Sequence, residues 1–507
     1  MSVAKYIIIA IFAAAAILRL ADTFRPVDHG SWRECDIGAI SRNFVNEGMN
    51  PLYPRIDWRG KGPGYAEMEF PAYPWLIAVS YEIFGQHEII GRLWALAFSL
   101  GTLFFFFRLA RENLGPFSSI AAFAFFAFNP LILESSTSLQ PEGLMMMAYV
   151  GAAFYFLRWV RDSRDRDLWL ALVFTILTLL AKATAAHIGL LFGVLLLQKY
   201  GLGVVRQSRV WLFGLLAILP AELWYGHAKT LWKTYGNSLG VSNEYHWIGA
   251  DFFTNPHFIT GILRNEAVYV WALFAFIVAA FGIVYGFREQ IAKVALIWMA
   301  SAFIMYLIAA RTTADDWASY YHIFSVAPAA LLFGLGLGKL GDFARRSADT
   351  FSTRGLAGNL VRVGIIMAVG LFAVSAFLVE AKAARTGLLE RRIAEPAFRC
   401  AEKLKPSLKK EGLILASGGY CRDADGYARA YNASFMFYWL GRKGFNICVE
   451  EQSIEHVREF AAKGAVYFVA QKIYLDQKTG LADQLKAAFP VTDECDEFYV
   501  FDLSSDR

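Results

Sequence analysis

Residues 87–130 read HEIIGRLWALAFSLGTLFFFFRLARENLGPFSSIAAFAFFAFNP, two long apolar runs joined by a segment that carries Arg108 and Arg111. An apolar run of roughly 20 residues can cross the hydrocarbon core of a bilayer as a helix. The pattern recurs along the 507-residue chain, in which 56% of residues are apolar and 18% are charged. Soluble domains average roughly 25% charged residues. The composition excludes a disordered chain, a coiled coil and an ordinary cytosolic enzyme, and it predicts a polytopic α-helical membrane protein.

Eleven apolar runs are long enough to be predicted as membrane spans. The first, 6–18, follows Lys5 and lacks a small-x-small cleavage site, so we predict a retained signal-anchor helix. The others lie at about 87–108, 117–133, 140–158, 168–183, 184–198, 210–226, 267–286, 294–310, 322–340 and 362–380. The apolar segment 70–84 is short and contains Pro71 and Pro74, so we predict an interfacial or re-entrant helix there.

Basic residues test this number of spans, because cytoplasmic loops are enriched in Lys and Arg. With the N-terminus in the cytoplasm, the loops predicted to be cytoplasmic contain Arg108, Arg111, Arg158, Arg161, Arg164, Arg166, Lys199, Arg206, Arg209, Arg288, Lys293, Lys339, Arg345, Arg346 and Arg354. An even number of spans would misplace the second half of this pattern. Eleven spans put a first long loop (21–86), a second one (227–266) and the tail after about residue 381 on the outer side.

The tail, 381–507, is soluble in composition. GLILAS (412–417), GAVYFVA (464–470) and EFYVFDL (497–503) predict short buried strands, which alternate with helical stretches at 392–405, 453–463 and 480–488. We therefore predict a small α/β domain. Its four cysteines allow two disulfides in any of three connectivities, or four buried free thiols. They are Cys400, Cys421, Cys448 and Cys495.

The glycines Gly336, Gly338 and Gly341 form a GxGxxG pattern, but they follow no predicted strand. Gly334 and Gly338 instead predict a small-residue face for helix packing.

Polar and ionisable residues gather in the outer loops or near the outer helix ends. Such groups in a membrane are costly and mark functional sites. A transporter would place some of them near the midplane, in broken helices of paired halves. The one-sided set favours an enzyme cavity that opens outward. It comprises Arg33, Glu34, Asp36, Arg42, Arg59, Lys61, Glu67, Glu69, Arg92, Glu134, Gln140, Glu142, Lys182, His187, Arg311, Asp315, Asp316 and His322.

Several outer segments resemble a known family. They are WRECDIGAISRNF (32–44), PLYPRIDWRGKGPGYAEMEFPAYPWLIAVSYEIFG (51–85), HEIIGRLWAL (87–96), QPEG (140–143) and YYH (320–322). In combination they resemble the bacterial GT-C membrane glycosyltransferases of the glycosyltransferase 39 / ArnT-like group. The resemblance is strong over about 1–200, diffuse to 340, and absent from the tail.

The resemblance implies a GT-C fold with a transmembrane catalytic domain at 1–380 in a bacterial inner membrane, so that the outer side is the periplasm. The α/β domain predicted from the residues at 381–507 would then be periplasmic. It also implies inverting transfer of a sugar from a polyprenyl-phosphate donor to a hydroxyl of a lipid, polysaccharide or protein acceptor of the cell envelope. From its position alone, we expect the tail to hold or select the acceptor.

Asp36 matches the family's acidic base in the first outer loop. A carboxylate beside the acceptor oxygen can remove its proton as it attacks the anomeric carbon, which contributes typically 10²–10⁴-fold to the rate. Such a base must be ionised, and its pKa need not be raised. Glu34, two residues earlier, is the weaker alternative because it would lie on another face of a helix.

The leaving phosphate needs cations more than an acid, because preorganised cations stabilise its growing charge. The candidates, in order, are Lys182, Arg311, Arg92 and Lys61. Lys182 could instead extend to the membrane boundary, and Arg92 could pair with Glu88 one turn earlier.

The candidates for sugar and acceptor contacts are Glu67, Glu69, Glu142, Asp316, Tyr321 and His322. Glu67 and Glu69 could also be solvated loop acids or bind a divalent ion with Asp36. Glu142 could merely complement a helix dipole, and Asp316 could belong to a polar connector. The sequence has no spaced His/Cys ligand set, so we expect no obligatory metal or cofactor.

Two other function classes compete with the enzyme. A transporter or flippase for a lipid-linked saccharide would use the same basic groove without a base. A non-catalytic assembly subunit would bind a partner through its outer domain. Replacing Asp36 by Asn separates the first class from the enzyme.

Overall fold

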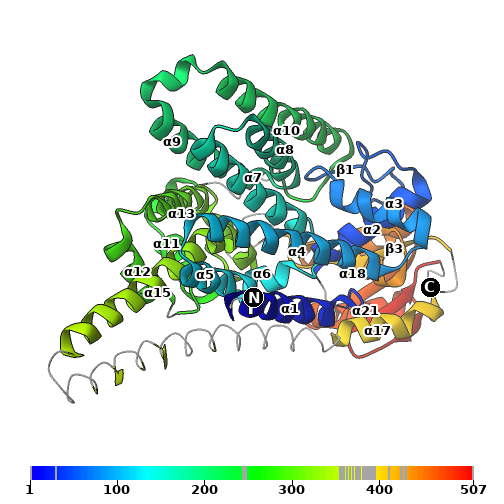
Figure 1. The fold of residues 1–507 in the computed structure, drawn as a ribbon. Coiled ribbons are helices and arrows are strands. Elements are labelled where there is room, and N and C mark those ends of the chain that lie inside the picture. The colour runs from blue at the N-terminus through cyan, green and yellow to red at the C-terminus, as the bar shows by residue number, and fades with distance from the viewer. Residues whose placement is uncertain are drawn as a thin grey trace. The chain divides into compact units, whose positions relative to one another are not determined.

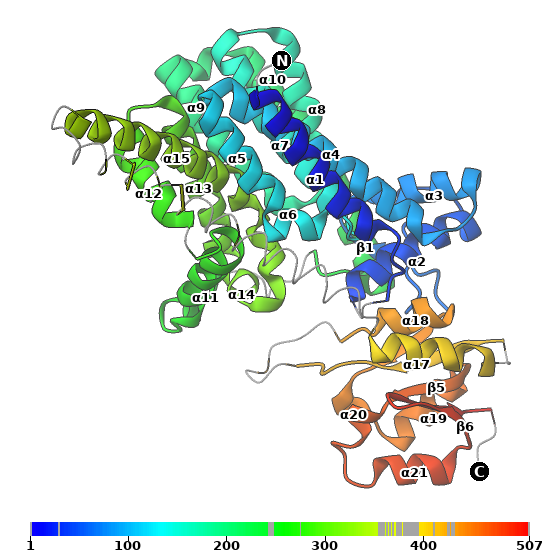
Figure 2. The same ribbon diagram turned by 60° about the horizontal axis from the view of Figure 1, so that its bottom comes forward.

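The computed structural model describes residues 3–28, 31–241, 248–273, 275–352, 395–408, 411–422, 426 and 431–504, with a few positions between 360 and 378. These residues form two compact units (Figures 1 and 2). The first unit comprises Met1–Phe24, Leu93–Glu222 and His246–Glu390, and the second comprises Arg25–Arg92, Leu223–Tyr245 and Arg391–Arg507. The first long loop therefore joins the tail in one unit. The predicted domain boundary near residue 381 lies outside the described residues.

The first unit is helical. Its longer helices are α1 (Val3–Thr23), α4 (Glu88–Asn113), α5 (Pro116–Phe128), α7 (Glu142–Asp162), α8 (Asp165–Ala181), α9 (Ile188–Tyr200), α10 (Ser208–Tyr235), α12 (Ala275–Gly286), α13 (Gln290–Ile308) and α15 (Ile323–Ser352), of which α4 and α10 extend into the second unit. The shorter ones are α6 (Pro130–Ser135), α11 (His257–Asn265) and α14 (Ala310–Thr313). Helix α15 packs against α5, α12 and α13, and α7 packs against α8.

Seven helical stretches in the described chain are long and apolar enough to cross a membrane. The number becomes eight if His257–Val270 and Ala275–Gly286, bent by 96°, form one span. Two more predicted spans correspond to the shorter helices α5 and α8. Ten of the eleven predicted spans thus coincide with described helices, and the eleventh, 362–380, falls mainly on residues that the structure does not describe. The multi-pass helical architecture is confirmed.

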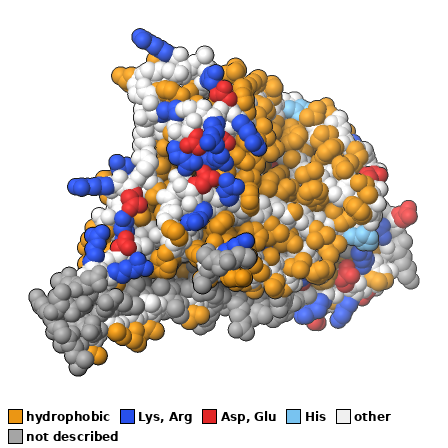
Figure 3. Space-filling model, in the orientation of Figure 1, with side chains coloured by type: hydrophobic (Ala, Val, Ile, Leu, Met, Phe, Trp, Pro, Cys, Tyr) orange, Lys and Arg blue, Asp and Glu red, His pale blue; other side chains and the backbone are white. Residues whose placement is uncertain are grey.

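The membrane-facing character of these helices shows on their surfaces. Apolar side chains cover much of the face drawn in Figure 3. On α10, for example, Trp211, Leu215 and Leu223 are each at least 60% exposed. Large apolar side chains facing outward on this scale are expected for helices solvated by lipid tails.

The predicted small-residue face of α15 is confirmed. A Cβ at Gly334 would lie 2.3 Å from the carbonyl oxygen of Ser118, and a Cβ at Gly338 would lie 2.1 Å from the Oγ of Ser118. Only glycine permits α15 to approach α5 this closely.

The tail is an α/β domain with a five-stranded sheet of order β4-β3-β5-β7-β6. Strand β3 (Leu413–Ser417) is parallel to β4 (Gly444–Ile447) and β5 (Ala465–Gln471), whereas β7 (Phe498–Asp502) is antiparallel to β5 and β6 (Val491–Glu494). Its helices are α17 (Pro396–Leu404), α18 (Ser434–Leu440), α19 (Ile454–Ala462), α20 (Lys472–Leu475) and α21 (Leu481–Ala488). The three predicted strands and three predicted helices are confirmed, and β4 and β6 were missed.

The tail cysteines form two disulfides, Cys400–Cys495 and Cys421–Cys448. The alternative of four free thiols is therefore wrong for this structure. Cys35 is buried and is not in either disulfide.

The first long loop contributes α2 (Trp32–Glu47), β1 (Ala66–Glu67) and α3 (Ala72–Phe84) to the second unit. Helix α3 confirms a helix over the predicted segment 70–84. Strand β1 pairs in parallel with β2 (Asn237–Ser238) of the second long loop. The side chain of Ser31 caps α2 by accepting a hydrogen bond from the Glu34 amide.

Candidate active site

Asp36 lies on α2 and is 1% exposed. Its Oδ1 accepts a hydrogen bond of 2.9 Å from the indole Nε1 of Trp58. Its Oδ2 is buried and has no hydrogen-bond partner among the described residues. Buried polar atoms in proteins are nearly always paired, and the exceptions call for a functional explanation. The free oxygen therefore marks Asp36 as a group prepared for a ligand or a proton.

The surroundings of Asp36 shift its acidity. Burial raises the pKa of the carboxyl to about 7, Asp57 adds to the increase, and the Trp58 hydrogen bond and the Arg33 charge oppose it. A base in this position needs only to be ionised, and a raised pKa is not expected from the sequence. A carboxyl whose pKa lies near neutrality is also a stronger proton acceptor, because general bases work best with a pKa near the operating pH.

Two more acids of the first long loop are buried and paired. Glu67 accepts a hydrogen bond from the hydroxyl of Ser238, and Glu69 forms an ion pair with Arg33. They are 1% and 7% exposed, so the alternative that they are solvated loop acids is wrong.

The two cations predicted in this unit differ in their surroundings. Arg92 is buried, donates to the carbonyl of Pro26 at 2.8 Å and lies 3.9 Å from the Glu34 carboxylate. Glu88, its suggested helix-end partner, accepts hydrogen bonds from the Val27 amide and from a tail hydroxyl. Lys61 is exposed, and its side chain lies beside Gly464 of the tail.

The first unit places Lys182 where α8 ends. Its backbone is extended, which breaks the helix before the short 3-10 turn Ala183–His187. The ammonium lies 2.6 Å from a carboxylate oxygen of Glu142 and 4.6 and 4.3 Å from the ring centroids of Tyr320 and Tyr321. A carboxylate and two aromatic faces thus surround a cation that is 14% exposed.

The remaining candidates of this unit also have protein partners. Arg311 pairs with Asp251, and Asp316 pairs with Arg264. His322 is fully buried, with Nδ1 2.8 Å from a carboxylate oxygen of Glu266 and Nε2 2.9 Å from the Thr313 carbonyl.

The structure therefore groups the predicted residues by unit. Asp36, Lys61, Glu67, Glu69 and Arg92 lie in one unit, and the other candidates, Glu142, Lys182, Arg311, Asp316, Tyr321 and His322, lie in the other.

Sequence reasoning missed two partners of these residues. Trp58 stands in the same loop segment that carries the family resemblance, and Tyr320 stands next to Tyr321. Their aromatic character was visible, but their contacts with Asp36 and Lys182 were not.

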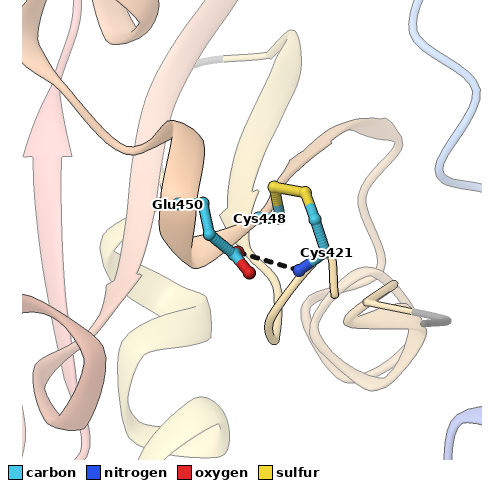
Figure 4. A group of neighbouring side chains, drawn as sticks. All are labelled: Cys421, Cys448 and Glu450. Carbon is cyan, nitrogen blue, oxygen red and sulfur yellow. Dashed lines mark hydrogen bonds between the residues drawn. A yellow bond between two sulfur atoms is a disulfide. The ribbon is translucent and has the colours of Figure 1, made fainter. Parts of the chain in front are cut away.

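One group of three potential metal ligands occurs in the described part of the chain, formed by Cys421, Cys448 and Glu450. The two sulfurs are joined in a disulfide, and the Glu450 carboxylate accepts a hydrogen bond of 2.8 Å from the backbone amide of Cys421 (Figure 4). Cysteine binds a metal as a thiolate, and both sulfurs are tied up in the disulfide, so this group does not fit a metal.

By sequence, one segment of the chain matches a known family. A family model described as dolichyl-phosphate-mannose-protein mannosyltransferase matches residues 68–225, a segment that contains Glu69, Arg92, Glu142 and Lys182 and begins after Asp36. A sequence search of curated proteins finds no significant match.

Solved structures match over far more of the chain. ArnT from Cupriavidus metallidurans in the apo state is 16% identical with a TM-score of 0.64, and the match covers 99% of this chain and 98% of that one. The same protein bound to undecaprenyl phosphate is 15% identical with a TM-score of 0.63, with the same coverage. The oligosaccharyltransferase AglB from Archaeoglobus fulgidus, in complex with an inhibitory peptide and a dolichol-phosphate, is 13% identical with a TM-score of 0.57 over 93% of this chain and 70% of that one. The chain thus has, over nearly its full length, the fold of the ArnT-like GT-C membrane glycosyltransferases that its first long loop resembles.

Proposed function

We propose that the protein is an inverting glycosyltransferase that moves a sugar from a polyprenyl-phosphate donor to a hydroxyl of a cell-envelope acceptor. The observation that carries this proposal is Asp36, a buried carboxyl with one oxygen held by Trp58 and one oxygen free among the described residues. The ArnT-like fold supports the donor class, since one matching structure holds undecaprenyl phosphate. One fold can host different chemistries, so the residues of the site decide the reaction.

In the proposed reaction, Asp36 accepts the proton of the acceptor hydroxyl as its oxygen attacks the anomeric carbon. The bond between that carbon and the phosphate oxygen breaks, and the lipid phosphate leaves as an anion. A single displacement inverts the anomeric configuration. We assign the donor phosphate to Lys182, because a protein cation near a phosphate forms a strong charge-assisted hydrogen bond. The phosphate would replace part of the contact that Glu142 now makes.

The test compares the wild type with Asp36→Asn, which keeps the size of the side chain and the Trp58 contact but removes the base. Mass spectrometry of cell-envelope glycans, with the gene deleted and restored, identifies the transferred sugar. Transfer should then fall by at least about 10²-fold in the variant, whereas binding of undecaprenyl phosphate should persist. The anomeric configuration of the product, read by NMR, tests inversion.

The same variant distinguishes the enzyme from a transporter or flippase. Such a protein needs no base, so normal glycan transfer by Asp36→Asn would remove the enzyme proposal and favour transport. We further propose that transfer needs no bound metal, and undiminished activity after treatment with EDTA would support this.

We propose that the tail and the outer loops face the periplasm of a bacterial inner membrane. Two disulfides support this orientation, because disulfides persist in oxidising compartments. A membrane-impermeant protease added to spheroplasts should cleave the tail, and protection of the tail would contradict the orientation.

A further inference from the structure

We propose that the C-terminal domain is a positioning element for the candidate base, holding α2 and the segment 57–60 in the register that joins Trp58 to Asp36. This inference rests on the proposed function for its catalytic meaning. The contacts that support it lie within one compact unit. This positioning role differs from the role of holding the acceptor, which the place of the tail in the sequence suggested.

The first set of contacts lies behind α2. Helix α18 of the tail packs against α2 (Figure 2). A Cβ at Gly38 would lie 2.7–2.9 Å from the ring and hydroxyl atoms of Tyr438, so only glycine permits this approach. Gly38 follows Asp36 by two residues, which is about 200° around a helix. Tyr438 therefore presses on the face of α2 roughly opposite the one that carries Asp36.

Hydrogen bonds fix α18 in this place. The Ser434 hydroxyl donates to the carbonyl of Trp32, the first residue of α2, at 2.8 Å. The Tyr438 hydroxyl donates to Glu88 at 2.8 Å, and the Trp439 indole donates to the Val27 carbonyl at 2.7 Å. Burial, together with the Glu88 charge, raises the pKa of Tyr438, which keeps its hydroxyl protonated as a donor.

The second set of contacts is made with the segment 57–60, which carries the Trp58 indole that binds Asp36. Gly444, the first residue of β4, donates its amide to the Asp57 carbonyl at 3.1 Å and accepts from the Gly60 amide at 2.7 Å. These two hydrogen bonds bracket Trp58. Gly60 has a φ of +57°, and a Cβ there would lie 2.3 Å from the ring of Phe445. The tail thus contacts this segment on both sides of Trp58, whose indole donates the hydrogen bond to Asp36.

The two sets of contacts come from adjacent parts of the tail. Helix α18 ends at Leu440 and β4 begins at Gly444. Between them, Lys443 forms an ion pair with Glu47 near the end of α2. Residues 434–445 of the tail thus contact both α2 and the segment 57–60, so losing one of the two contacts would let Trp58 move relative to Asp36. Catalytic geometry must be held within about 0.5 Å, so such a shift would affect catalysis.

The test uses a readout that needs no sugar donor or acceptor. In the full-length protein in detergent micelles, infrared difference spectroscopy detects the protonated carboxyl band that disappears in Asp36→Asn. A pH titration of this band gives the protonation midpoint of Asp36, on which Arg33 and Asp57 act as charged neighbours. Trp58→Phe, which keeps an aromatic ring but loses the donor, gives the midpoint of a carboxyl without its hydrogen bond.

Two tail-side perturbations should reproduce the effect of Trp58→Phe. Phe445→Ala removes the ring that Gly60 contacts, and Gly38→Ala inserts a methyl against Tyr438. Each should raise the midpoint by about one unit, because losing a hydrogen bond to the charged form raises the pKa of a carboxyl.

Phe460→Ala is the matched control. It removes a ring whose centroid lies 5.1 Å from that of Phe445, but Phe445 supplies the atoms nearest to Gly60. Its midpoint should equal that of the wild type. The thermal unfolding midpoint and intact disulfides confirm folding of each variant, and Phe445→Ala carries the test if Gly38→Ala does not fold.

An unchanged midpoint in the folded tail variants would overturn the proposal. A midpoint that falls would also overturn it, because it would show that the tail only shields Asp36 from water. If the wild type transfers no sugar, the proposed function fails, while this titration still decides whether the tail positions Asp36. If it does transfer sugar, kcat should fall in the tail variants with little change in the KM for the donor.

Discussion

Replacing Asp36 by Asn should make the protein more stable while it lowers the rate of transfer by at least about 10²-fold. The carboxyl has an ordinary pKa of 3.8 and one of about 7 in the fold, where burial disfavours its charge. Between these values the folded state binds more protons than the unfolded state, so the free energy of unfolding decreases as the pH rises. The loss is complete above about pH 7. Three units of pKa correspond to roughly 4 kcal/mol, since one unit is about 1.4 kcal/mol.

The measurement is the free energy of unfolding of the purified protein in denaturant at two pH values. Asp36→Asn should gain roughly 4 kcal/mol at about pH 8 and only roughly 2 kcal/mol at about pH 5, where the folded carboxyl is still protonated. Asp57→Asn is the control, because Asp57 is buried but paired with Arg42 and Asn43. Its loss should destabilise the protein. The reasoning is refuted if Asp36→Asn gains no stability at high pH.

Asp36, Lys182 and the longer disulfide each allow a further test. The pH profile of kcat/KM should rise tenfold per unit below about pH 7 and level off above it, as Asp36 loses its proton; a profile flat from about pH 5 to 8 would exclude Asp36 as the titrating base. Lys182→Met should weaken binding of undecaprenyl phosphate by about 10–100-fold in a fluorescence titration, because a hydrogen bond to a charged group contributes about 1.5–3 kcal/mol; equal affinity would assign the phosphate to another cation. Replacing Cys400 and Cys495 by Ser opens a loop of 95 residues and should lower the free energy of unfolding of the tail by up to about 4.7 kcal/mol. Denaturant unfolding, monitored by a probe in the tail, measures this loss. An unchanged transition would show that the bond does not constrain the unfolded chain.

Much of the architecture could be predicted from local patterns. A membrane span needs only a sufficient length of apolar residues, so ten predicted spans coincide with helices regardless of their neighbours. The buried strands β3, β5 and β7 were visible for a similar reason, because their runs are apolar throughout. Strand β6 reads VTDE and is mostly exposed, and β4 is short and begins with Gly444. Their pairing with longer strands, rather than their own composition, makes them strands.

The candidate site was predictable residue by residue but not contact by contact. Asp36 was identified from its loop and from a family resemblance. Its raised pKa was not expected, because burial depends on what α2 packs against. The partners of Glu69 and Lys182 were likewise hidden, since ion pairs between residues distant in the chain have no signature in local sequence.

The sequence by itself determined the class of this protein, a multi-pass helical membrane protein with an α/β domain in its tail, because hydropathy and strand patterns act over neighbouring residues. Only the tertiary structure decided that the first long loop and the tail form one unit, which disulfides the tail contains, and that Trp58 reaches Asp36. These features depend on contacts between segments as far apart as Gly38 and Tyr438. Such contacts form only when chain folding brings distant surfaces together, and no local pattern encodes them.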